Sequence, residues 1–436
     1  MANQKRDLLD DLIDIQSDWQ ALSNPFGDIA DSLAADPSQR KVFNPADYKE
    51  KPFANSNRCL CTASGRDDVC TRCLDVCPVN AIEIHKQSVI IGDDCRKCGL
   101  CAAACPTETI STRRHMPRQV YDKIARAASA YEHCYVTCTR ALKRLPKDNE
   151  IVLGCVGAIS RDLWFSLMAD YDNISVYLPV GICDRCKTTT GEEFYCDAIG
   201  TAEEWAQASL GLVADESEMT HELTREYKRS QFMSSAVHSA ERLLTRTNPA
   251  LAGAKAVANK ISAHASRLDQ LQRTLEGAVG AKTSNNRQRM LTQNRKLVMG
   301  ALQHDEGLAK FIDLTAPVCD ASKCTMCGDC AKVCTTRALD LDVNGHITIQ
   351  ASYCVSCGAC VKVCEDGALA MEPMDVTELI VPDPAAEELA RKKAQAKAEA
   401  QKYIEQGKKQ LSRAADVLEG LGTSDSGAND SKTSKK

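Results

Sequence analysis

Cysteine spacing is the strongest chemical signal in the chain. The stretch that begins at Cys95 reads C-x2-C-x2-C-x3-C-P and contains Cys95, Cys98, Cys101 and Cys105. Three thiolates so close in sequence can hold three corners of one iron–sulfur cubane, while the fourth cysteine, carried away by the next helical turn, reaches a second cluster. Thiolate sulfur is a soft ligand that suits such clusters better than hard cations do. The spacing therefore predicts [4Fe–4S] chemistry.

The same spacing recurs twice further along the chain, and an imperfect copy precedes the first motif. The two perfect copies are Cys324, Cys327, Cys330, Cys334 and Cys354, Cys357, Cys360, Cys364. The imperfect copy contains Cys70, Cys73 and Cys77, with Asp67 where a leading cysteine is expected. Cys61 and Cys59 lie just upstream, and either could supply the missing thiolate. We name Cys61 as the candidate and keep Cys59 as the alternative.

These motifs resemble those of bacterial-type ferredoxins with two [4Fe–4S] clusters, and the resemblance occurs twice. It implies dicluster domains at 56–112 and 315–373, with hairpins expected at 81–91 and 338–349. Asn344-Gly345 is a strong two-residue turn signal in the second hairpin. The crossed ligation of that family implies four ligand sets: Cys70 and Cys73 with Cys61 or Cys59 and Cys105; Cys95, Cys98, Cys101 with Cys77; Cys324, Cys327, Cys330 with Cys364; and Cys354, Cys357, Cys360 with Cys334.

Residues 113–210 predict a small α/β domain rich in cysteine. Strands are expected at 133–139, 150–155 and 174–178, with a helix that begins at Pro117 and another capped by Ser160, which is the rhythm of a parallel crossover. Cysteines fall at or after the ends of these strands: Cys138, Cys155, Cys183 and Cys186. Ligands gather at the carboxyl ends of strands in open α/β sheets. A further metal centre is therefore predicted here, with a cluster, zinc or structural thiols as the alternatives and with Cys134 and Cys196 as rival ligands.

Composition narrows the class of protein. The chain has 436 residues and 24 cysteines, but its first residues lead into an acidic helix rather than the apolar run of a signal peptide. We find no run of about 18 apolar residues and expect no transmembrane span. Many cysteines without an export signal favour a cytoplasmic metalloprotein over a secreted disulfide scaffold.

The remaining segments carry no cluster motif. An acidic helix and loop are expected at 1–55, a basic helical segment at 211–314, and a charged helix with a disordered tail at 374–436. Between Arg225 and Gly300, 14 Lys and Arg stand against four acids, which predicts either a solvated face or a docking face for an acidic redox partner. A nucleic-acid face would need interleaved aromatic residues, and the stretch contains few, so no nucleic-acid partner is expected.

The predicted fold class is a multidomain α+β chain in which two ferredoxin-type dicluster domains flank the α/β cysteine-rich domain and the helical segment. The whole chain resembles multi-cluster iron–sulfur subunits of anaerobic redox complexes. This resemblance implies four [4Fe–4S] clusters, or five if the middle cysteines bind a cluster, that relay electrons between a donor and a catalytic oxidoreductase subunit. The alternative is a reductase whose middle cysteines act on a disulfide or a small sulfur compound. No residue is assigned a catalytic role.

Overall fold

The computed structural model describes residues 42–225, 227–228, 250–382, 391–392 and 395. The chain divides into two compact units, Met1–Val381 and Pro382–Lys436. The predicted N-terminal acidic helix and nearly all of the predicted C-terminal helix and tail lie outside the described residues. The short helix η8 (Val376–Leu379) is described, and its Val376 and Leu379 are buried, so the first unit extends beyond the predicted ferredoxin boundary at 373.

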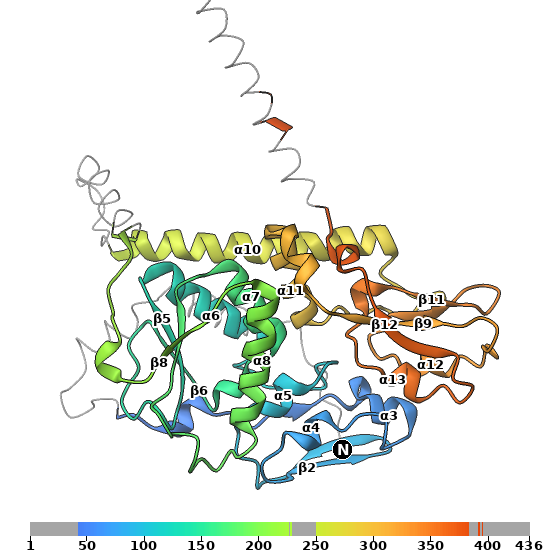
Figure 1. The fold of residues 1–436 in the computed structure, drawn as a ribbon, viewed down its shortest axis with the longest axis horizontal. Helices are drawn as coiled ribbons and strands as arrows, with labels where there is room; N and C mark the ends of the chain where they lie inside the picture. The colour runs from blue at the N-terminus through green and yellow to red at the C-terminus, as the bar shows by residue number, and fades with distance from the viewer. Residues whose placement is uncertain (1–41, 226, 229–249, 383–390, 393–394, 396–436) are drawn as a thin grey trace, which may run out of the picture. The chain divides into compact units, whose positions relative to one another are not determined.

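A parallel sheet lies at one side of the first unit, at the left of Figure 1. Its strand order is β6 (Glu150–Leu153), β5 (Cys134–Cys138), β7 (Ile174–Tyr177) and β8 (Gly211–Val213), and every pairing is parallel. The first three strands were predicted. The fourth corrects the helical prediction for 211–314. The close pairing of β8 with β7 favours a glycine, because a Cβ on Gly211 would lie 2.3 Å from Ser175 Oγ, and that hydroxyl would have to move.

Helices cover this sheet and join it to the rest of the unit. They are α6 (Pro117–Ala130), α7 (Arg161–Asp170), α8 (Gly191–Ala206), α10 (Ala250–Val279) and α11 (Gln293–His304). The predicted starts are confirmed, since α6 begins at Pro117 and Ser160 Oγ accepts a hydrogen bond from the Leu163 amide. Figure 1 shows α10 extending over the α/β part towards the second ferredoxin part.

Asp170 links four of these helices. Its carboxylate accepts a hydrogen bond from the Tyr121 hydroxyl of α6, lies 3.0 Å from His304 Nδ1 of α11, and lies 4.0 Å from His264 Nε2 of α10. The His264 ring also stacks on Tyr121, with ring centroids 4.7 Å apart. The helical segment is therefore packed on the α/β part by specific contacts.

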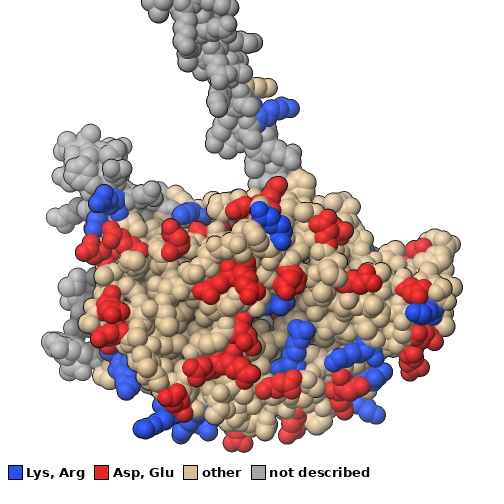
Figure 2. Space-filling view, viewed as in Figure 1, with Lys and Arg blue, Asp and Glu red and all other residues tan. Residues whose placement is uncertain are grey.

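Only part of the predicted basic docking face is used within the chain. The described cations that remain exposed include Arg267, Arg273, Lys282 and Arg287. Arg295 and Arg289 are buried, Arg289 pairs with Asp340, and Lys296 Nζ bonds Asp269 at 2.8 Å. Figure 2 shows acidic and basic side chains interspersed over the visible face. The stretch 280–289 contacts the second ferredoxin part through two hydrogen bonds from Ser284 to the Asp340 carboxylate, at 2.6 and 2.8 Å.

The two ferredoxin parts have matching elements. In the first, β1 (Phe53–Ala54) pairs with β4 (Ile110–Ser111), β2 (Ile82–His85) pairs with β3 (Ser88–Ile91), and the helices are α3 (Leu60–Ser64), α4 (Arg72–Asp75) and α5 (Leu100–Ala104). In the second, β9 (Thr315–Cys319) pairs with β12 (Leu369–Pro373), β10 (Leu339–Leu341) pairs with β11 (Ile347–Ile349), and the helices are α12 (Asp329–Val333) and α13 (Ala359–Lys362). One apolar core joins them, including Val69, Ile82, Val333, Leu339 and Val363.

Both predicted hairpins are present, but the turn of the second is longer than predicted. Asp342 N donates to His346 O at 2.8 Å, so three residues, Val343, Asn344 and Gly345, form the loop. Gly345 has a φ of 84°, and its amide donates to Asp342 O at 3.0 Å. This is a three-residue loop that ends in a left-handed glycine. The Asp342 carboxylate favours it by accepting hydrogen bonds from the amides of Asn344 and His346.

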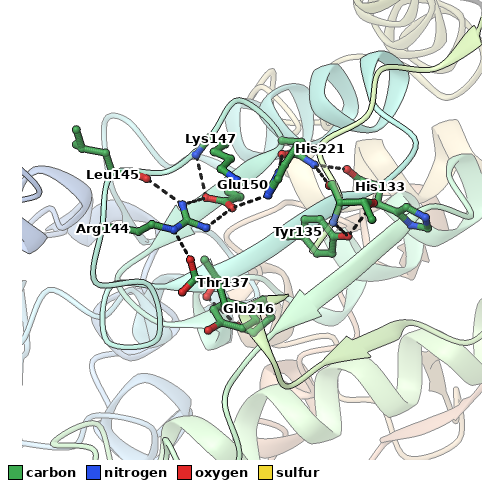
Figure 3. A network of polar contacts seen from close by, with 12 residues as sticks. His133, Tyr135, Thr137, Arg144, Leu145, Lys147, Glu150, Glu216 and His221 are labelled. Atoms are coloured by element: carbon green, nitrogen blue, oxygen red, sulfur yellow. Dashed lines mark hydrogen bonds and ion pairs between the residues drawn. The ribbon is translucent and has the colours of Figure 1, made fainter. Parts of the chain in front are cut away.

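A polar network closes the amino-terminal edge of the parallel sheet (Figure 3). Glu150, at the start of β6, is 4% exposed and accepts two hydrogen bonds of 2.7 Å from Arg144. Arg144 also pairs with Glu216, and His221 Nε2 lies 3.7 Å from Glu150, so the segment after β8 is tied to β6. These contacts stabilise the amino-terminal ends of the strands. The opposite, carboxyl-terminal ends carry four cysteines: Cys138, Cys155, Cys183 and Cys186. Among the described residues, no helix is long and apolar enough to cross a membrane.

We predict that His264 makes stability depend on pH. Burial, with smaller effects of Arg118 and Arg267, lowers its pKa to about 3. An unfolded histidine titrates near 6.5, so the unfolded chain takes up the proton first and stability falls as the pH drops below about 6.5. His264→Phe keeps the stacking on Tyr121 and removes the titration. At pH 5 the variant should avoid a loss of up to about 2 kcal/mol.

Chemical unfolding of both proteins between pH 8 and pH 4.5 measures this difference. His85→Phe, at an exposed histidine, is the control and should leave the pH profile unchanged. Parallel pH profiles for the wild-type chain and His264→Phe would contradict the prediction.

Candidate metal centres

The ferredoxin parts gather their motif cysteines into four sets. Site A is Cys59, Cys70, Cys73, Cys105; site B is Cys77, Cys95, Cys98, Cys101; site C is Cys324, Cys327, Cys330, Cys364; and site D is Cys334, Cys354, Cys357, Cys360. Sites A, C and D each surround a small cavity. In site B, burial raises the pKa of Cys98, and the charges of Cys95 and Cys77 raise it further. Each set also contains the last cysteine of the neighbouring motif, as the crossed ligation predicts: Cys105 in site A, Cys77 in site B, Cys364 in site C and Cys334 in site D.

Site A contains Cys59 rather than Cys61. Cys59 lines the cavity with the other three cysteines, whereas the buried Cys61 Sγ contacts the carbonyl oxygens of Cys70 and Asp67 at 3.2 and 3.6 Å. A hydrogen bond from the Cys61 thiol lowers the pKa of Cys59, and the same contact raises the pKa of Cys61. Cys59 is thus placed to bind with the other three cysteines, whereas the Cys61 thiol is directed at backbone carbonyl oxygens. Our prediction had named Cys61 as the ligand, and the order of the two cysteines along the sequence contains no signal that separates them.

Backbone amides point at several of these sulfur atoms. The amide four residues after the last cysteine of a motif donates to its Sγ at Cys77, Cys105 and Cys364, with N–S distances of 3.3, 3.2 and 3.3 Å. Lys97 N makes a similar contact with Cys95 Sγ at 3.4 Å. Such hydrogen bonds stabilise the thiolate form and influence the reduction potential of a cluster. The donor sets therefore fit iron–sulfur clusters.

Cys319 was missed by the sequence reasoning. It ends β9, and its pKa is raised by burial and then by contact with Cys324 of site C. Its position shortly before a cluster motif, like that of Cys59, was the available signal. It adds a fifth thiol beside site C.

The middle domain brings its four predicted cysteines together at the carboxyl edge of the sheet. Site E is Cys138, Cys155, Cys183 and Cys186, which line a cavity of about 270 Å³. The rival ligands lie elsewhere: Cys134 is fully buried at the start of β5, and Cys196 is exposed on α8. Four cations also line the cavity, against one acid, Glu192: Lys49, Arg96, Arg140 and Lys187. This positive surrounding favours an anionic group held by thiolates.

Site E directly adjoins site B. Cys98 of site B lines the same cavity, and Thr190 Oγ1 donates to Val76 O, beside Cys77, at 2.7 Å. The loops touch at a glycine, because a Cβ on Gly154 would lie 2.6 Å from Lys97 O and 3.3 Å from Cys98 Cα. This close approach of the two backbones requires glycine at position 154.

The other sites also follow one another. Burial raises the pKa of Cys101 of site B, and the charge of Cys73 of site A is among the smaller causes. Arg72 lines the cavity of site A, and its charge lowers the pKa of Cys357 of site D, which burial raises to about 11. Sites C and D share the second ferredoxin part. The spatial order is therefore E, B, A, D, C.

None of the five sites has its side chains arranged for a single metal ion, so this criterion does not distinguish site E from sites A–D. Within the described ranges, no three Cys, His, Asp or Glu side chains are arranged to hold one metal ion, and this holds for sites A–D as well as site E.

The comparisons with known proteins agree with the two ferredoxin parts. The model of the 4Fe–4S dicluster domain matches residues 68–109 and 323–368. A ferredoxin of Methanothermococcus thermolithotrophicus is 35% identical over 46 residues, which are 10% of this chain and 77% of that protein. An uncharacterised ferredoxin of Methanocaldococcus jannaschii is 37% identical over 43 residues, which are 9% and 69% of the two chains. No solved structure matches the chain significantly.

These findings define an iron–sulfur protein with electron-carrying domains. Through its two dicluster segments, the chain belongs to the [4Fe–4S] ferredoxin family.

We predict that Cys59, and not Cys61, is the fourth ligand of site A. Cys59→Ser should lower the iron content by up to about four atoms per chain, or alter the paramagnetic resonance of one cluster, because a hydroxyl is a poor soft-metal ligand. Cys61→Ser is the matched control and should keep the full iron count. The opposite pattern would assign the ligand to Cys61.

A second prediction concerns the contact between sites E and B. Gly154→Ala should destabilise the chain by about 1–3 kcal/mol, because two backbones must move apart. Gly200→Ala in α8 is the control: its Cβ would meet nothing within 4 Å, and alanine favours the helix. Denaturant unfolding compares the two, and equal stabilities would show that the loops separate without cost.

Proposed function

We propose that the chain is a multi-cluster electron-transfer protein, with one [4Fe–4S] cluster at each of sites A to D and a further cluster at site E. The observation that carries the proposal is the unbroken succession of cysteine sets from site E through sites B, A and D to site C. A bound cluster supplies one-electron redox chemistry. The chain's own residues hold the sets in sequence along one packed unit.

The surroundings of the sets support this role. Thiolates at each site supply the ligands, backbone amides donate to several of the sulfur atoms, and the shared apolar core around sites A, C and D limits access of water. Lower water access strengthens the interaction between fixed charges and bound groups. Because the fixed charges differ from site to site, the clusters can differ in their affinity for an electron.

The two ends of the succession are the proposed places of exchange with redox partners. Site E opens on a cavity lined by four cations, which suits an electron donor or acceptor with an acidic surface. At the other end, Cys327 of site C is exposed, and so are two apolar side chains, the adjacent Met326 at 51% and Val343 at 99%. The hairpin loop that contains Val343 reaches Met326, since a Cβ on Gly345 would lie 3.4 Å from Met326 Sδ. We propose that the chain relays electrons between a donor and a separate catalytic subunit. The matched relatives are ferredoxins and give no support to the disulfide reductase alternative.

The fifth centre is tested in the full chain. A fragment of 117–210 would lack both β8 and the Cys98 loop that lines site E. We expect Cys155→Ser to remove iron and sulfide equivalent to one cluster while the other clusters remain, because site E contributes no ligand to sites A–D. Cys196→Ser is the control. Loss of one zinc instead would make site E structural, and unchanged metal content would remove it from the path.

A further inference from the structure

Site D has a buried cation beside it. Arg295, near the start of α11, is 3% exposed, and its Nη2 donates to the carbonyl oxygen of Cys354 at 2.6 Å. Its Nε is also buried and has no hydrogen-bond partner. The side chain therefore delivers a positive charge to the backbone of a site D cysteine.

No carboxylate neutralises this charge at close range. In the described part of the chain, no ion pair within 4.0 Å includes Arg295, whereas the neighbouring Arg289 pairs with Asp340. Burial lowers the pKa of Arg295, and the charges of Asp162 and Cys354 oppose that shift to a smaller extent. A buried cation without a counter-ion is unfavourable unless an anion compensates for its lost hydration.

Site D and site C differ in the charges around them. Two further cations act on site D: Arg72 on Cys357, and Arg337, which interacts with Cys334. Site C has acids instead, because Asp329 and Asp366 line its cavity and Asp320 follows Cys319. Lysines pair with two of them, Lys332 with Asp329 and Lys323 with Asp320, so Asp366 is the acid lining the cavity for which no ion pair is seen among the described residues. No acid lines the cavity of site D. A buried cation thus lies beside site D, and a carboxylate lies beside site C.

We propose that Arg295 is the built-in counter-charge of the cluster at site D and makes site D a stronger electron acceptor than site C. The inference rests on the proposed function, since it requires clusters at both sites. Reduction adds one negative charge, which a buried cation stabilises and nearby carboxylates oppose. In the resulting step one electron passes from site C, which is oxidised, to site D, which is reduced, and no bond or proton is transferred.

The test is an anaerobic redox titration of the full chain, followed by electron paramagnetic resonance. Arg295→Met keeps the length of the side chain and removes the charge, and Arg295→Lys keeps the charge. At a fixed potential, we expect the ratio of reduced to oxidised site D to fall about tenfold or more in Arg295→Met, which corresponds to about 59 mV for one electron. Arg295→Lys should retain most of the wild-type ratio.

Lys296→Gln is the matched control, because it removes a charge from the adjacent residue of α11 whose Nζ bonds Asp269 and Gln272 instead. Its titration should match that of the wild-type chain. An unchanged midpoint of site D in Arg295→Met, or an equal fall in Arg295→Lys, would overturn the proposal, since a structural role does not depend on charge in this way.

Iron and sulfide counts distinguish a failure of the proposed role of Arg295 from a failure of the proposed function. Full counts with an unchanged potential reject the role of Arg295, whereas counts below four clusters in the wild-type chain reject the proposed function itself. If Arg295→Met does not assemble its clusters, the wild-type chain still tests the proposal. The signals of sites D and C in its spectra are assigned from their loss in Cys357→Ser and Cys327→Ser, respectively. Reduction of site D before site C supports the proposal, and the reverse order overturns it.

Discussion

The structure depends on one apolar core that two distant parts of the sequence share. Val69 and Ile82 of the first ferredoxin part pack in the same core as Val333, Leu339 and Val363 of the second. Burial of apolar surface is not directional, so it holds the parts together without fixing their register. The two parts also influence each other electrostatically, since the charge of Arg72 at site A lowers the pKa of Cys357 at site D. Without this shared core, sites A and B would be separated from sites C and D.

The α/β part and the long helices act as a frame for this contact. Asp170 ties α6, α7, α10 and α11 together, and Ser284 then anchors the chain on Asp340 at the entrance to the second ferredoxin part. The same α/β part contributes site E at its carboxyl edge, while the Arg144–Glu150 network closes its amino edge (Figure 3). One sheet therefore both supports the succession of sites and extends it.

The proposed difference in electron affinity between sites C and D comes from charges and not from the cysteine spacing. The two sites have the same spacing, but Asp329 and Asp366 line one, and Arg295 lies buried beside the other. In a region with little water, a fixed charge has a larger effect on a bound group than it would at the surface. The two acids lie within or next to the cysteine motifs, whereas Arg295 is brought to site D from a distant segment, α11.

The sequence by itself determined the local features: the cysteine spacing, the two hairpins, the helix starts at Pro117 and Ser160, and the three strands that end near Cys138, Cys155 and Cys183. These follow from short-range rules of turn, cap and ligand spacing. The longer turn at Asn344-Gly345 escaped prediction because the Asp342 carboxylate holds it.

Only the tertiary structure decided the features that depend on contacts between distant residues. They include the choice of Cys59 over Cys61, the addition of β8 to the sheet, the contact of Gly154 with the Cys98 loop, and the burial of Arg295 against Cys354. In each case, the partner is fixed by packing of the whole unit, and neither spacing nor composition encodes that packing locally.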